Sequence, residues 1–108
     1  MPTTLENPKI HAVVFRSGEW LIAQCLEYDI ATQARDLKAL LIEVQRILTA
    51  QIVAANLEGF EDPFADIPKA PKEFWQMYED AVARLEPMRN IEIPMMRGPR
   101  PVLELRAA

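Results

Sequence analysis

The chain has 108 residues, of which 50% are hydrophobic, and it carries a formal net charge of −4 at pH 7. This length suits a single core, so we expect residues 1–108 to fold as one domain. The acidic balance argues against a nonspecific polyanion binder, because phosphate binding needs concentrated lysine and arginine. Cys25 is the only cysteine, which excludes an intrachain disulfide and a four-cysteine zinc site.

Two runs rich in strand-forming residues, 10–16 and 20–26, are separated by a three-residue turn that contains Gly18. Because glycine adopts a positive φ at low steric cost, this arrangement predicts a β-hairpin. A third run rich in β-branched residues, 30–34, follows after three polar or charged positions. The three runs together predict a three-stranded antiparallel meander.

The first predicted strand is apolar on both faces, which is typical of a central strand. One face holds His11, Val13 and Phe15, and the other holds Ile10, Ala12 and Val14. A sheet of this kind needs cover on both sides. One helix covers one face, so the second face must meet the C-terminal segment or another subunit.

A long helix is predicted after the meander, with Asp36 as its N-cap and Gly59 as its stop. Its apolar positions recur at steps of three and four residues: Leu37, Leu40, Leu41, Val44, Leu48, Ile52 and Ala55. Ile42, Ile47 and Val53 fall outside the centre of this stripe. This apolar band is wider than contact with one sheet face requires. It therefore indicates a second contact for the helix, such as another subunit.

The second half of the chain, 57–108, is predicted to be an extension on the core. Phe60, Phe64 and Ile67 are expected to anchor its first part. A second helix is predicted at about 71–86, with Trp75 off its apolar stripe as an interface residue. The alternating residues 102–106 predict a strand, and the prolines before them favour an edge position in this sheet or in a neighbour's.

The sequence WLIAQCLEYDIATQ at positions 20–33, followed by the leucine-rich helix, resembles the HicB-like antitoxin domain. The resemblance covers about 10–56, a strand-strand-strand-helix core. It implies a reduced RNase H-like α+β fold that binds a small mRNA-cleaving toxin and masks the toxin's active site. Many members of the family add a C-terminal DNA-binding domain. The sequence after Glu58 predicts one convincing helix, whereas a helix-turn-helix needs two.

No catalytic pattern is found in the sequence, and we predict that the chain is not an enzyme. A two-metal nuclease needs converging carboxylates, but 10–15 contains no acid. His11 is the only histidine, and a histidine in a strand of this kind is expected to be structural. The three glycines are scattered, so no phosphate-binding loop is present and no cofactor or metal is predicted.

Two classes of function remain open. The first is a HicB-like protein-interaction module, a homo-oligomer that binds a small basic toxin through Glu27, Tyr28, Asp29 and Trp75. The second is a nucleic-acid-binding regulator that uses Arg97 and Arg100. No run approaches the ~18 apolar residues of a membrane span, and the N-terminus lacks signal-peptide features, so a cytoplasmic protein is expected.

Overall fold

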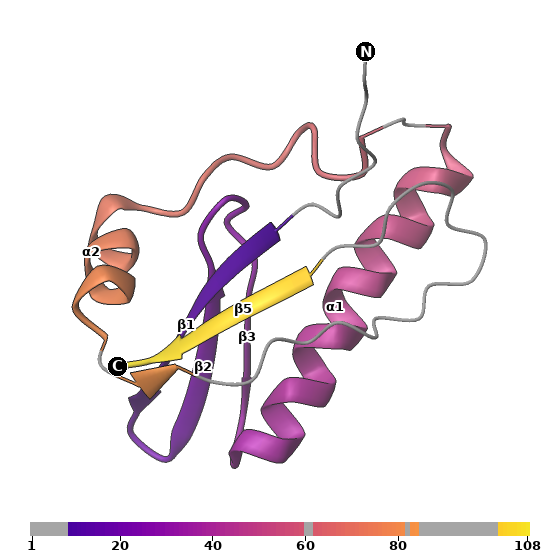
Figure 1. The fold of residues 1–108 in the computed structure, drawn as a ribbon. Helices are drawn as coiled ribbons and strands as arrows, with labels where there is room; N and C mark the ends of the chain where they lie inside the picture. The colour runs from indigo at the N-terminus through magenta and orange to yellow at the C-terminus, as the bar shows by residue number, and fades with distance from the viewer. Residues whose placement is uncertain (1–8, 60–61, 82, 85–101) are drawn as a thin grey trace.

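The computed structural model describes residues 9–59, 62–81, 83–84 and 102–108, which form an α+β fold (Figure 1). The elements along the chain are β1 (Lys9–Ser17), β2 (Trp20–Cys25), β3 (Ala31–Ala34), α1 (Leu37–Leu57), α2 (Lys72–Asp80), β4 (Ala83–Arg84) and β5 (Val102–Ala107). The predicted α+β class is confirmed.

The strands form one mixed sheet in the order β3-β2-β1-β5-β4. β1 pairs antiparallel with β2, and β2 pairs antiparallel with β3. β5 pairs with β1 along its whole length in a parallel register, and the two residues of β4 pair antiparallel with its end. The sheet is therefore larger than the predicted three strands. The predicted edge position for 102–106 fails at the end of β5, where Arg106 pairs with β4; within the described residues, 102–105 pair with β1 alone.

Three local predictions from turn and cap chemistry are confirmed. Gly18 in the turn between β1 and β2 has a φ of 62°, a value that favours glycine. At the start of α1 the Asp36 side chain accepts a hydrogen bond of 2.8 Å from the Ala39 amide. This bond satisfies one of the amides that a helix N-terminus leaves without a partner. Gly59, with a φ of 84°, follows the end of the helix.

The main core lies between α1 and one face of the sheet. The inner side of α1 consists of Leu40, Val44, Leu48, Ile52 and Ala55, all buried. These side chains pack against the α1-facing residues of the strands, among them Ile10, Ala12, Leu103 and Leu105. The predicted stripe is therefore buried from Leu40 to Ala55, with Leu41 partly buried, whereas Leu37 in the first turn is 39% exposed.

The other sheet face is covered in part by α2, which lies across the sheet from α1 (Figure 1). Here Val13, Leu26 and Tyr78 form a smaller buried cluster. Of the two covers predicted for this face, the C-terminal segment is the one observed. The helix is shorter than the predicted 71–86, because the backbone becomes extended at Ala81 and then pairs with β5 through β4.

Among the described residues, α1 alone is long and apolar enough to cross a membrane on length and composition. Core helices pass the same test, and the inner side of α1 is packed on the sheet.

Candidate functional site

The turn after β2 carries three of the predicted partner-binding residues, and Glu27 is the most constrained of them. Its carboxylate accepts a hydrogen bond of 2.7 Å from the His11 backbone N–H and lies 2.5 Å from the His11 Nδ1. The other ring nitrogen, Nε2, is 3.5 Å from a carboxylate oxygen of Glu104 on β5. Lys9 lies 3.6 Å from the second oxygen of Glu104. One histidine thus lies between two carboxylates on the sheet face that α2 covers.

This cluster connects four separate parts of the chain: β1, the turn after β2, α2 and β5. The His11 ring also meets the edge of Tyr78 on α2, with the ring centroids 5.5 Å apart. Arg106 lies over the Tyr78 ring at 4.4 Å and donates a hydrogen bond to the Tyr78 carbonyl. The predicted structural role of His11 fits these contacts, although no pattern in the sequence indicates its acidic neighbours.

Tyr28 and Asp29 also make contacts within the chain. The Tyr28 ring stacks on Phe64, with centroids 4.3 Å apart. Burial raises the pKa of the Tyr28 hydroxyl above its usual value, and the nearby charges of Asp62 and Glu27 act in the same direction. Asp29 accepts a hydrogen bond from Gln24, and its backbone N–H donates to the Pro68 carbonyl.

Trp75 on α2 is half-buried against the smaller cluster of Val13, Leu26 and Tyr78. The Lys69 ammonium lies 5.9 Å from the centre of its ring. All four predicted partner-binding residues therefore have neighbours in their own chain, and the structure does not gather them into one cavity. The alternative residues, Arg97 and Arg100, lie outside the described residues.

No group of three or more metal-ligating side chains occurs within 9–59, 62–81, 83–84 and 102–108. Cys25 is buried under α1. Burial, with a smaller contribution from the Glu27 charge, raises the pKa of its thiol to about 12. A thiol in this state is a poor nucleophile, because the thiolate is the reactive form.

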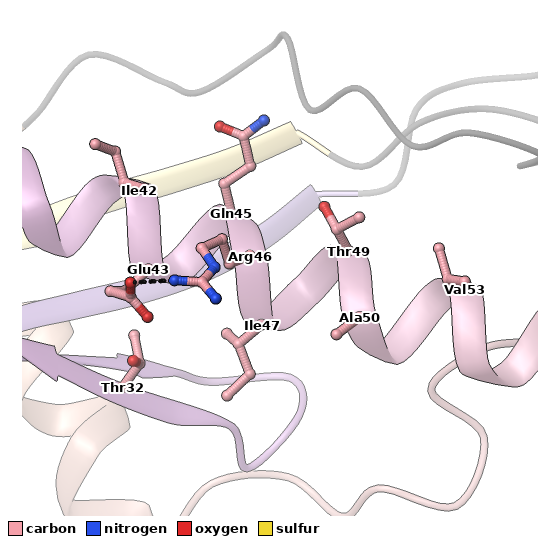
Figure 2. Close-up of a pocket in the computed structure, with 9 residues that line it drawn as sticks. All are labelled: Thr32, Ile42, Glu43, Gln45, Arg46, Ile47, Thr49, Ala50 and Val53. Atoms are coloured by element: carbon pink, nitrogen blue, oxygen red, sulfur yellow. Dashed lines mark hydrogen bonds and ion pairs between the residues drawn. The ribbon is translucent and has the colours of Figure 1, made fainter.

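The outer side of α1 carries an open groove that the sequence indicated only through its surplus of apolar residues. We call it the α1 groove. Its volume is about 790 Å³, and it is lined by Thr32, Ile42, Glu43, Gln45, Arg46, Ile47, Thr49, Ala50 and Val53 (Figure 2). The Ile42 side chain remains 53% exposed. Glu43 and Arg46 form an ion pair of 3.0 Å within the groove.

A second hollow lies where α1 ends, and we call it the acidic depression. It has a volume of about 230 Å³ and is lined by Gln51, Ala54, Ala55, Glu58, Asp62, Pro63, Ala65 and Asp66. All three of its carboxylate side chains are exposed. Leu57, the last residue of the helix, is 71% exposed. The negative end of the helix dipole adds to the negative charge here.

The sequence offered one signal for the acidic depression, the acidic, proline-containing connection between the two helices. The predicted anchoring of this connection on the core is confirmed for Phe64 and Ile67, and Phe60 lies outside the described residues. The sequence did not indicate that the connection lies against the end of α1. A hydrogen bond of 2.9 Å from the Gln51 side chain to the Pro63 carbonyl holds it there. Comparisons with protein-family models, with curated proteins and with solved structures found no match to this chain.

Proposed function

We propose that this chain is a HicB-like protein-interaction module that binds a small basic protein, in the manner of an antitoxin that masks an RNA-cleaving toxin. The observation that carries the proposal is the acidic depression beside an exposed leucine. Glu58, Asp62 and Asp66 offer three exposed carboxylates, and Leu57, the residue before Glu58 in the chain, offers exposed apolar area. The proposed module does no chemistry of its own and acts in the cytoplasm.

The chemistry of the depression favours a cationic partner. Carboxylates at a helix C-terminus repel an anion, and they attract lysine or arginine side chains from a basic surface. An apolar anchor surrounded by charges is a common arrangement in protein interfaces. A basic RNA-cleaving protein must present cations to bind phosphates, and these cations would meet the depression.

The order of elements supports the finer, HicB-like part of the proposal. The residues that resemble the HicB-like domain lie on β2, the following turn and β3, and α1 comes next in the chain. This is the strand-strand-strand-helix order that the resemblance implies for 10–56. The turn of Glu27–Tyr28–Asp29 contacts the connection between the helices through Phe64 and Pro68. These contacts link the predicted partner-binding turn to the loop that bears the depression.

The test is a titration of this chain with the protein encoded by the neighbouring reading frame, where an antitoxin's partner is expected. We expect a tight complex whose association slows as salt rises. The double variant Glu58→Lys/Asp66→Lys should weaken it about tenfold or more. Asp62 is left unchanged because its carboxylate accepts a hydrogen bond from the Phe64 amide. Glu73→Lys/Glu79→Lys, an exposed double reversal on α2 with the same change in net charge, is the matched control.

Equal affinity for the charge-reversed variant and the control would contradict binding at the acidic depression. A neighbouring frame that encodes no basic protein would contradict the antitoxin-type role. The alternative function, a nucleic-acid-binding regulator, predicts that the chain shifts DNA or RNA and that this binding falls steeply with salt.

A further inference from the structure

Strand β3 forms one end of the sheet, and within the described chain its outer edge pairs with no other strand. Its sequence is Ala31-Thr32-Gln33-Ala34, without proline or charge. Natural edge strands commonly carry lysine, proline or a bulge that blocks pairing with another chain. β3 has none of these residues, although it is short. Its outer backbone groups are therefore suited to pair with a further strand.

The α1 groove lies on the same side of the molecule as this edge. Thr32 of β3 lines the groove together with Glu43 and Ile47 of α1, and Figure 2 shows Thr32 beneath Glu43. α1 packs mainly on β3 and β2, near the end of the sheet. Anything that pairs with the β3 edge would therefore also meet this side of α1.

The charges in the groove are complementary to themselves under a two-fold rotation. Glu43 and Arg46 lie one helical turn apart, above Thr32. Consider two copies of the chain related by a two-fold axis that passes between Glu43 and Arg46 and through β3. This rotation brings the β3 strands of the two copies together in antiparallel pairing. The same rotation packs the two α1 helices side by side in opposite directions. Glu43 of each copy then faces Arg46 of the other, and Ala50, which is small and exposed, permits the helices to approach closely.

We propose that a second copy of this chain docks at the β3 edge and the α1 groove, so that two sheets join into one through β3. A second copy fits this surface because a two-fold dimer needs a self-complementary patch, and both the strand edge and the Glu43–Arg46 pair have this property. The groove also supplies apolar area from Ile47 and Val53. This dimer is independent of the partner proposed for the acidic depression, which lies at the C-terminal end of α1.

The first test is the molar mass by light scattering across a dilution series. The native chain should approach twice the 12.3 kDa of one chain at high concentration. Ala50→Lys places a long charged side chain at the helix contact and should give the mass of one chain, with an unchanged circular dichroism spectrum. Gln76→Lys on α2 should leave the dimer intact. The reversal Glu58→Lys/Asp66→Lys should leave it intact as well, which separates this test from that of the proposed function.

Charge exchange tests the two-fold relation itself. Glu43→Arg alone brings like charges together and should raise the dimer dissociation constant about tenfold or more. The exchanged pair Glu43→Arg/Arg46→Glu restores opposite charges both within each copy and between copies, so it should restore the dimer. Equal dimer affinity for the native chain, Glu43→Arg and Ala50→Lys would overturn the proposal, as would a native chain of single mass throughout the series.

Cysteine cross-linking locates the strand edge. Antiparallel partners near a two-fold axis lie about 4.5–5.5 Å apart at Cα, within the range that a disulfide spans. Thr32→Cys or Gln33→Cys should therefore form an interchain disulfide rapidly under mild oxidation. The native Cys25 is buried and contributes little background. Cross-linking of Gln76→Cys at the same rate would show random collision and would overturn the proposed interface.

Discussion

The inner side of α1 is entirely apolar, whereas the outer side mixes apolar residues with polar and charged ones, and the surroundings of the two sides are opposite. On the inner side Leu40, Leu48 and Ile52 have no exposed surface and pack against the sheet. On the outer side Ile42 and Leu57 are more than half exposed. Burying a large aliphatic side chain contributes about 1.5–3 kcal/mol to stability, and an exposed one contributes little. The inner side thus explains the fold, and the outer side leaves apolar area for other molecules.

The largest expected effect comes from a matched pair of leucines on α1. Leu48→Ala removes a completely buried side chain and should lower the free energy of unfolding by about 2–5 kcal/mol. Leu57→Ala removes one that is 71% exposed and should change it by less than about 0.5 kcal/mol. Urea unfolding measures both. Similar losses for the two variants would break the distinction between the two sides of the helix.

A pH-dependent effect should follow from Cys25 in the core under α1. Its thiol has a pKa of about 12 in the folded chain against an ordinary value of 9.0. Above pH 9 the unfolded chain loses this proton while the folded chain retains it, so stability should fall as pH rises from 9 toward 12. The slope from this group reaches about 1.4 kcal/mol per pH unit.

The measurement for Cys25 is urea unfolding between pH 8 and the highest pH at which the chain stays folded, with Cys25→Ala as the comparison. The variant should start less stable, because it loses buried sulfur, and should show a shallower decline in stability with pH. Parallel declines for the two proteins would mean that the thiol ionises freely in the folded chain. Tyr28, whose pKa is also raised, stays in both proteins.

The smallest of these effects concerns the polar cluster across the sheet from α1. His11→Ala, Glu27→Ala and the double variant form a cycle for the short contact between the two side chains. Both groups are partly exposed, so we expect a coupling free energy of about 0.5–2 kcal/mol in favour of the pair. Additive losses of stability would show that the contact between His11 and Glu27 contributes nothing. The stability of the α2 side of the sheet would then come from its apolar contacts.

The elements that depend on local chemistry could be predicted from the sequence. The hairpin at Gly18, the N-cap at Asp36 and the buried stripe of α1 follow from steric and hydrogen-bond rules that act over a few residues. The central position of β1 also follows, because both of its faces are apolar.

The pairings between distant segments could not be predicted in this way. Alternation in 102–106 identifies a strand but not its neighbour, so the parallel pairing of β5 with β1 was missed. The early end of α2 was missed for a similar reason: no helix breaker follows Asp80 before Pro87, and pairing of β4 with β5 takes the chain out of the helix. The position of His11 between Glu27 and Glu104 exists only because that topology brings them together.

Above all, we infer that the outer side of the molecule, at β3 and α1, meets another chain. Hydrogen–deuterium exchange of the native protein at several concentrations tests it directly. We predict that protection of the amides in Ala31–Ala34 rises with concentration, while the central strand β1 stays equally protected throughout. Protection of β3 that does not change with concentration, in a chain that keeps the mass of one copy, would contradict the claim.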